Sequence, residues 1–275
     1  MFERELQIAR AAVNDAADLV MRVYASDFAV QYKGRNDPVT DADRRANGAI
    51  VEAIRAAFPD DGICAEEGTH EEALAAAKNG GRCWFVDPLD GTREFVSRNG
   101  EFCVMVGFAI DGEAKLGVVR APAWNRTLWG VVGDGAREHG VDGVERVLRV
   151  AEPPNDPRHA RLVVSRSHMH PDVNAVAEAL AIGDIRPCGS VGLKAALVSA
   201  GEADLYVHAG GGPKLWDGCA PEAIARAAGA HVTDGEGRAL HYAGDRLALD
   251  RGIVVAAPTL HARAVAAFPK SHRSS

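Results

Sequence analysis

The sequence contains no hydrophobic run that approaches the ~18 residues needed to cross a bilayer as a helix. Its first residues mix apolar and charged side chains, so they lack the basic and then apolar pattern of a signal peptide. We therefore expect a cytoplasmic protein that does not insert into membranes.

Cysteine is also scarce, with five residues at scattered positions and no Cys-X-X-Cys pair. This spacing argues against a site for a soft metal such as zinc. An odd number of well-separated cysteines in a protein of this kind is typical of reduced, mostly buried thiols. We expect that state at Cys64, Cys83, Cys103, Cys188 and Cys219.

Basic residues are outnumbered, because 31 lysines and arginines face 38 aspartates and glutamates for a net charge of -7. This balance argues against a general affinity for nucleic-acid backbones. It leaves a small anionic ligand open, since a metal ion and a few placed cations can reverse the field locally.

The first half of the sequence predicts two helices followed by a sheet. Apolar residues recur at helical spacing over residues 3–24, and a second helix is predicted from Ala42 to Phe58 with Thr40 or Asp41 as its N-cap. Short apolar runs of strand type follow, two of them joined by a hairpin signal. The predicted strands are residues 63–65, 83–86, 102–110, 115–120 and 127–132. They suggest an antiparallel sheet covered by the two helices.

A segment rich in proline and polar residues, Val150–His159, is the best candidate boundary within the chain. Beyond it, predicted strands alternate with predicted helices, which is typical of an α/β unit with an open sheet. The four helices predicted in this half are, in chain order, residues 173–181, 193–200, 220–228 and 260–268. We therefore expect an α+β unit over residues 1–150 and an α/β unit over residues 151–275.

The most informative segment is Asp87-Pro88-Leu89-Asp90-Gly91-Thr92, which follows an apolar strand directly. Two carboxylates at the end of one strand can reach the same cation, and oxygen ligands are those that magnesium prefers. Backbone N–H groups of Gly91 and Thr92 can meet an anion beside that cation. A turn whose aspartates cap a helix is the alternative. The ordered strand, proline, glycine and threonine favour the metal site.

Three further acidic positions are candidates for the same site. Glu66 follows the predicted strand over residues 63–65, where a solvated acidic turn is the alternative. Asp43 lies in the first turn of the second helix and Asp217 lies near another helix start. An acidic residue at a helix start is favoured by the helix dipole alone, and this role is compatible with metal ligation.

These motifs together resemble the inositol monophosphatase superfamily of metal-dependent phosphatases. The matching elements, in chain order, are Val39-Thr40-Asp41-Ala42-Asp43, Ala65-Glu66-Glu67-Gly68, Asp87-Pro88-Leu89-Asp90-Gly91-Thr92 and Trp216-Asp217. They run through nearly the whole chain. The resemblance implies an α/β fold, namely the layered αβαβα sandwich of the inositol monophosphatase and fructose-1,6-bisphosphatase type.

Within that superfamily the chain looks most like the bacterial 3'(2'),5'-bisphosphate nucleotidases. The segments that carry this likeness are Arg93-Glu94, Asn99–Phe102, Val164–His168, Gly189–Lys194 and Lys214–Glu222. The implied reaction is hydrolysis of the 3'-phosphate of 3'-phosphoadenosine 5'-phosphate, a by-product of sulfate assimilation, to AMP and phosphate.

The resemblance also implies roles for individual residues. Two or three magnesium ions would be held by Glu66, Asp87, the Leu89 carbonyl, Asp90 and Asp217. Asp43 and Thr92 would form the catalytic pair that takes a proton from the attacking water. The implied substrate contacts are Glu66, Gly91, Thr92, Ser165, His168, Ser190, Lys194 and Asp217.

Other functions stay open at this point. An inositol, histidinol or fructose-bisphosphate phosphatase would use the same metal ligands, and only relative kcat/KM values distinguish these substrates. A non-catalytic module that binds metal or nucleotide is a second alternative. A homodimer is also open, because the sequence does not locate apolar surface patches.

Overall fold

The computed structural model of the protein describes residues 2–34, 37–167, 169–210 and 212–269. A seven-stranded sheet, in the order β3-β4-β5-β6-β7-β8-β9, forms its first half. Its strands are β3 (Gly62–Ala65), β4 (Arg82–Asp90), β5 (Cys103–Ile110), β6 (Glu113–Ala121), β7 (Arg126–Val131), β8 (Gly135–His139) and β9 (Glu145–Leu148). β3 is parallel to β4, and every later pair in this sheet is antiparallel.

A five-stranded sheet, in the order β11-β10-β12-β14-β13, forms the second half. Its strands are β10 (Arg161–Ser165), β11 (Asp184–Cys188), β12 (Leu205–His208), β13 (His231–Thr233) and β14 (Ile253–Ala256). β10 is parallel to both β11 and β12, so the carboxyl ends of these three strands meet at one edge. A small hairpin of β1 (Val30–Gly34) and β2 (Asp37–Thr40) precedes both sheets.

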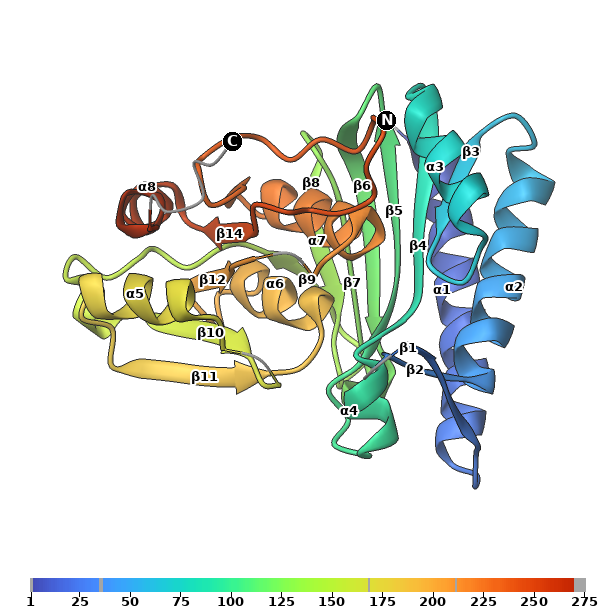
Figure 1. Ribbon diagram of the computed structural model, residues 1–275, viewed down its shortest axis with the longest axis horizontal. Coiled ribbons are helices and arrows are strands. Elements are labelled where there is room, and N and C mark those ends of the chain that lie inside the picture. The colour runs from blue at the N-terminus through green and yellow to red at the C-terminus, as the bar shows by residue number, and fades with distance from the viewer. Residues whose placement is uncertain (1, 35–36, 168, 211, 270–275) are drawn as a thin grey trace.

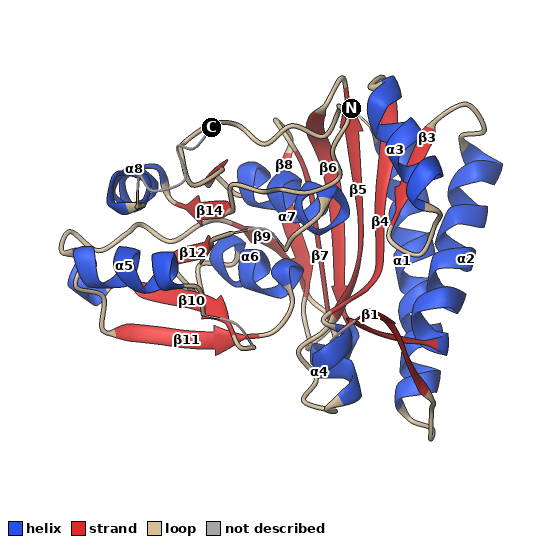
Figure 2. Ribbon diagram, in the orientation of Figure 1, coloured by secondary structure: helices blue, strands red, loops and turns tan. Residues whose placement is uncertain are grey.

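Helices and sheets alternate in five layers (Figures 1 and 2). The helices are α1 (Glu3–Tyr24), α2 (Asp41–Ala57), α3 (His70–Asn79), α4 (Thr92–Val96), α5 (Pro171–Ala179), α6 (Val191–Ser199), α7 (Leu215–Ala227) and α8 (Pro258–Ala267). α1 and α2 cover one face of the large sheet, α6 and α7 lie between the sheets, and α5 and α8 cover the far face of the small sheet. The predicted αβαβα sandwich is confirmed.

Alternating side chains explain why both sheets are buried on two faces. Along β4, Trp84 packs against α1 and α2, whereas Phe85 packs toward the middle helices. Along β10, Leu162 packs with α5 and α8, whereas Val163 packs toward the middle helices. Successive strand residues point to opposite faces, so strands apolar on both faces need helices on both sides.

Close approach of the backbone seats α7 on the large sheet. A β-carbon at Gly117 would lie 2.2 Å from the carbonyl oxygen of Ala220, and one at Gly130 would lie 2.9 Å from the Cα of Ile224. Only glycine leaves room for the helix backbone at these positions. The two glycines therefore fix the distance between the sheet and the first turns of α7, which carry Asp217.

The start of α7 differs from the prediction. The sequence pattern predicts a helix from Ala220, but the helix begins at Leu215 and continues through Pro221. Proline has no N–H, so the carbonyl of Asp217 lacks its usual donor within the helix. Contacts of α7 with β5, β6 and β7 hold the helix through this defect. As a consequence Asp217 lies in the first turn and not ahead of the helix.

Other expectations for the first half agree with the structure. The two N-terminal helices occur at Glu3–Tyr24 and Asp41–Ala57, and the hydroxyl of Thr40 caps the second one. Within the described ranges, none of the helices combines the length and apolar character that a bilayer crossing requires. The division near residue 150 stays a prediction, because α6 and α7 from the second half contact strands of the first sheet.

Candidate active site

Asp87 and Asp90 come from the end of β4, and both are buried, with exposed fractions of 1% and 8%. In a regular strand, side chains three residues apart point to opposite faces. The register between β4 and β5 slips between these two residues, across Pro88 and Leu89. The slip, together with a hydrogen bond from the Leu89 N–H to Asp87 Oδ1 at 3.0 Å, allows both carboxylates to serve the same side.

Glu66 joins this pair from the neighbouring strand. β3 runs parallel to β4 with Ala65 opposite Val86, and the N–H of Glu66 donates to the Val86 carbonyl at 3.0 Å. This bond extends the pairing by one residue and places Glu66 beside Asp87. The charge of Glu66 acts on Asp87 there and raises the pKa of that carboxyl.

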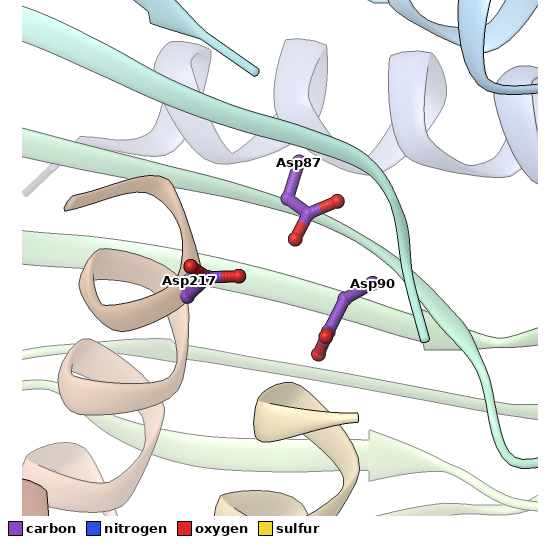
Figure 3. A group of neighbouring side chains, drawn as sticks. All are labelled: Asp87, Asp90 and Asp217. Carbon is purple, nitrogen blue, oxygen red and sulfur yellow. The ribbon is translucent and has the colours of Figure 1, made fainter. Parts of the chain in front are cut away.

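Asp217 approaches from the second half, in the first turn of α7. One of its carboxylate oxygens accepts the N–H of Lys214, so the residue also caps the helix. Ligand oxygens of Asp87, Asp90 and Asp217 all lie within 4.8 Å of one another. Figure 3 shows these three side chains gathered between the end of β4 and the start of α7.

Burial and mutual repulsion govern the charge state of this cluster. Burial raises the pKa of Asp87 well above its usual range, and repulsion from Glu66, Asp90 and Asp217 raises it further. Burial and the charge of Asp90 raise the pKa of Asp217 to about 7. Crowded carboxylates of this kind favour either a bound proton or a bound cation.

The donor atoms fit a hard cation. The clustered side chains offer only carboxylate oxygens, which magnesium takes at near-octahedral sites together with water and substrate oxygens. Three of the four predicted carboxylate ligands, Asp87, Asp90 and Asp217, are gathered here, and Glu66 lies near enough to Asp87 to raise its pKa. The Leu89 carbonyl, between Asp87 and Asp90 in the chain, accepts the Thr92 hydroxyl at 3.1 Å.

Thr92 and Asp43 meet as predicted, although they are far apart in sequence. The Thr92 hydroxyl lies 3.3 Å from Asp43 Oδ1, and Asp43 itself is buried, with 1% exposed. The other oxygen of Asp43 accepts the N–H of Thr40 at 2.8 Å and its hydroxyl at 2.7 Å. This second set of bonds fixes the orientation of the Asp43 carboxylate. The first turn of α2 and the turn after β4 thus hold the pair together.

Ser190, expected as a substrate contact, binds a member of the carboxylate cluster directly. Its hydroxyl donates to Asp90 Oδ2, and the N–H of Gly192 donates to the same oxygen at 2.7 Å. Ser190 Oγ also accepts the N–H of Leu193 at 3.0 Å and so caps α6. The start of α6 therefore holds one oxygen of Asp90, Oδ2, in place.

The remaining second-half candidates take up different positions. Lys194 is buried, and its ammonium donates to the carbonyls of Ser190 and Cys188. Burial lowers the pKa of Lys194. Ser165 lies half-buried at the carboxyl end of β10. His168 lies outside the described residues.

All five cysteines are buried with free thiols, which confirms the prediction. Cys103 is the one nearest the site, with its sulfur 3.3 Å from the Ser190 hydroxyl oxygen. Burial raises the pKa of the Cys103 thiol well above its usual range, so it stays a neutral packing group.

A layered α/β fold with a buried carboxylate cluster between its sheets defines a class of proteins suited to hold cations beside an anionic ligand. The model of the inositol monophosphatase family matches residues 2–273. The chain therefore belongs to this family, and the predictions of the family, of its fold and of a phosphatase are confirmed.

Individual relatives make the likeness more specific. The 3'(2'),5'-bisphosphate nucleotidase CysQ of Salmonella typhimurium is 37% identical over 244 residues, covering 88% of this chain and 94% of the relative. The solved structure of CysQ from Bacteroides thetaiotaomicron is 28% identical, with a TM-score of 0.78, covering 94% of this chain and 98% of that one.

A relative named for another substrate has an equally similar backbone. The solved structure of the inositol monophosphatase IMPase of Thermotoga maritima is 31% identical, with a TM-score of 0.79, covering 97% of this chain and 96% of that one. Backbone similarity therefore does not separate the two substrates, and side chains around the cluster must do so.

Two functional features escaped the sequence analysis. The backbone N–H of Gly192 binds Asp90, and the carboxylate of Glu101 binds two segments of the second half. Glu101 and Arg166 both lie in segments that carried the resemblance, yet their contact spans 65 residues. Sequence spacing carries no signal for such a contact.

Proposed function

We propose that the protein is a magnesium-dependent phosphatase that removes the 3'-phosphate of 3'-phosphoadenosine 5'-phosphate and leaves AMP. The observation that carries the chemistry is the close group of Asp87 and Asp90, which are buried, and the half-buried Asp217, whose crowded carboxylates favour a bound cation. The nucleotide substrate is supported by the name of the 37% identical Salmonella relative and by the sequence motifs shared with such nucleotidases.

Two or three magnesium ions would be held by the predicted ligands Glu66, Asp87, Asp90, Asp217 and the Leu89 carbonyl. Bound magnesium supplies Lewis-acid chemistry, because it offsets charge on a phosphate and makes a nearby water more acidic. Asp90 and Asp217 lie on separate elements, β4 and α7, and their carboxylates lie close together.

Proton removal from the attacking water is assigned to Thr92 and Asp43. The Thr92 hydroxyl can accept that proton while it donates its own to Asp43 Oδ1, 3.3 Å away. Thr40 holds the opposite oxygen of Asp43, so the receiving oxygen keeps a fixed direction toward Thr92. General-base assistance of this kind contributes about 10²–10⁴-fold to a rate.

Substrate binding is assigned to both halves. Glu66, Gly91, Thr92 and Asp217 would surround the phosphate that is cleaved, and Ser165, His168, Ser190 and Lys194 would lie toward the rest of the nucleotide. Lys194 supplies positive charge for the second phosphate, and its bonds to the carbonyls of Cys188 and Ser190 place it behind the turn that leads into α6. A singly phosphorylated polyol has less need of that charge.

Phosphate release in saturating magnesium tests this function. 3'-Phosphoadenosine 5'-phosphate, inositol 1-phosphate, histidinol phosphate and fructose 1,6-bisphosphate would be compared at equal subsaturating concentrations. We expect a preference of about 100-fold or more in kcat/KM for the adenosine bisphosphate. The Asp90→Asn variant, prepared identically, controls for contaminating phosphatase.

An inositol phosphatase is the second candidate, and the similarity to the Thermotoga enzyme structure favours it over a histidinol phosphatase. A preference for inositol 1-phosphate in the same assay would replace the nucleotide proposal by this one. Tight nucleotide binding with no turnover of any substrate would instead support a non-catalytic binding module.

A further inference from the structure

Glu101 binds the second half of the molecule at two places. Its carboxylate forms a two-bond fork with the guanidinium of Arg166, with Nε 2.6 Å from Oε2 and Nη2 2.5 Å from Oε1. Oε2 also accepts the backbone N–H of Gly189 at 2.7 Å. Arg166 follows the end of β10, and Gly189 follows the end of β11. One side chain of the first half therefore holds two neighbouring strand ends of the second.

The backbone that carries Glu101 is itself fixed. The N–H of Glu101 donates to the side chain of Asn99 at 2.9 Å, and Gly100 between them has a positive φ of 82°. Phe102, the next residue, is fully buried. A carboxylate on such a turn has little freedom, so it can set the position of the groups that bind to it.

The two segments that Glu101 binds also form hydrogen bonds directly with each other. The N–H of Arg166 donates to the Cys188 carbonyl at 3.1 Å, and its guanidinium donates to the Pro187 carbonyl at 2.9 Å. A β-carbon at Gly189 would lie 2.7 Å from the carbonyl oxygen of Glu101, so the turn and the Glu101 backbone are in direct contact. We call Glu101, Arg166 and the Gly189 N–H the Glu101 clamp.

Each arm of the Glu101 clamp ends next to a proposed substrate contact. Ser165 immediately precedes Arg166, and Ser190 immediately follows Gly189. Ser190 in turn donates to Asp90 in the carboxylate cluster.

We propose that Glu101 is a specificity-positioning residue, whose clamp sets where the segments around Ser165 and Ser190 stand relative to the carboxylate cluster. This inference rests on the proposed function, because it concerns the part of the substrate beyond the cleaved phosphate. The clamp governs binding of that part and leaves the hydrolytic chemistry unchanged. Arginine and carboxylate forks suit this purpose, since two parallel bonds fix orientation as well as distance.

The test compares two substrates in Glu101→Gln, a variant that keeps the side-chain shape and one acceptor oxygen. One substrate is whichever of the four phosphates above the wild-type enzyme prefers, and the other is p-nitrophenyl phosphate. At saturating magnesium we expect kcat/KM for the preferred substrate to fall about tenfold, mainly through KM, and that for p-nitrophenyl phosphate to change less than about twofold. Arg166→Met should give a smaller effect, because it leaves the Gly189 bond, and Arg166→Lys should restore part of it.

Glu138→Gln is the matched control. Glu138 is a buried carboxylate in an equivalent fork with Arg126, at 2.5 Å and 3.0 Å, on strands β7 and β8. Its loss should lower stability and leave the ratio between the two substrates unchanged. The preferred substrate is chosen by measurement, so the test of Glu101 stays valid whichever phosphate that substrate is. A preference for a substrate other than the nucleotide would contradict the proposed function and leave the role of Glu101 to be decided by this test.

Amide hydrogen exchange supplies a readout that does not need activity. In Glu101→Gln we expect faster exchange in residues 162–167 and 188–193 and no change in β7 or β8, whereas Glu138→Gln should show the reverse pattern. An equal fall in kcat/KM for both substrates, or none for either, would overturn the proposal. Unchanged exchange around Ser165 and Ser190 would overturn it too.

Discussion

Two sets of buried carboxylates in this molecule have opposite electrostatic surroundings. At the ends of β3 and β4, acidic groups crowd one another, and burial with this repulsion raises the pKa of Asp87. At the start of β10 and β12, the Asp204 carboxylate forms a two-bond fork with the Arg161 guanidinium, and each N–O distance is 2.8 Å. Burial acts to raise the pKa of Asp204, but the bonds from Arg161 outweigh it and hold the pKa below its usual range.

The direction of the pKa shift separates carboxylates that stabilise the fold from carboxylates that are suited to bind a cation. Glu101 belongs to the first kind: burial acts to raise its pKa, but the bonds from Arg166 and Gly189 outweigh burial and lower it. For Asp87, in contrast, the main influences on its pKa within the described residues are burial and its acidic neighbours, and all of them raise it. The cluster thus weakens the metal-free fold and favours cation binding, which is the usual arrangement of a functional site.

The largest expected effect is that of Asp90→Asn on turnover. Removal of one charged ligand should lower kcat/KM by about 10³-fold or more while the protein stays folded. Its hydrogen bonds from Ser190 and Gly192 need only one oxygen, which asparagine still offers. Steady-state kinetics with circular dichroism as a check on folding would measure this.

Asp204→Asn makes the same change in a carboxylate that is paired with an arginine. It removes an equally buried acid from its arginine partner, so it should lower the melting temperature and leave turnover within about twofold. Wild-type activity in Asp90→Asn, or loss of turnover in a folded Asp204→Asn, would remove the distinction between the two sets.

A smaller loss is expected for Thr92→Ala. Without the hydroxyl, Asp43 cannot receive a proton through Thr92, so kcat should fall about 10²-fold with KM little changed. Thr92→Ser keeps the hydroxyl and should retain most of the rate. Equal rates for the alanine and serine variants would contradict the proton-transfer role and leave Thr92 as a capping residue of the turn.

Much of the fold followed from the sequence because its signals are local. The helices at Glu3–Tyr24 and Asp41–Ala57 carry clear apolar stripes, and the second begins with a Thr40 capping box. α3 was missed because alanines supply most of its apolar face. β8 and the edge strand β9 were missed because short strands with many charged residues give no apolar run.

The site divides in the same way. Acidic residues at strand ends were found because the strand, turn and spacing lie within a few residues, and the resemblance joined the separate motifs. Contacts that depend on the docking of the two sheets were not found. The N–H of Gly192 on Asp90 and the three bonds of Glu101 arise only when α6 and the ends of β10 and β11 meet the first half. Tertiary packing decides such pairs, and periodicity contains no trace of them.

The smallest effect, and the most direct test of the repulsion, is the pH dependence of the metal-free protein. The pKa of Asp217 is about 7 in the folded state against 3.8 as the ordinary value. A raised folded-state pKa gives stability that is complete below the ordinary value and is lost as pH rises through about 7. Asp217→Asn carries no charge at any pH and keeps an oxygen for the Lys214 N–H. It should therefore match the wild type near pH 4 and exceed it at pH 8.

The gain at pH 8 should be on the order of 1–3 kcal/mol in the free energy of unfolding, measured by urea denaturation in EDTA. Saturating magnesium should reverse the order of the two proteins, because only the wild type keeps the full set of ligands and a bound ion stabilises the state that binds it. A variant less stable than the wild type at pH 8 in EDTA would show that Asp217 is held by compensating bonds, as Asp204 is. The carboxylate cluster would then belong with the carboxylates that stabilise the fold, and only the sequence resemblance would still support cation binding at this site.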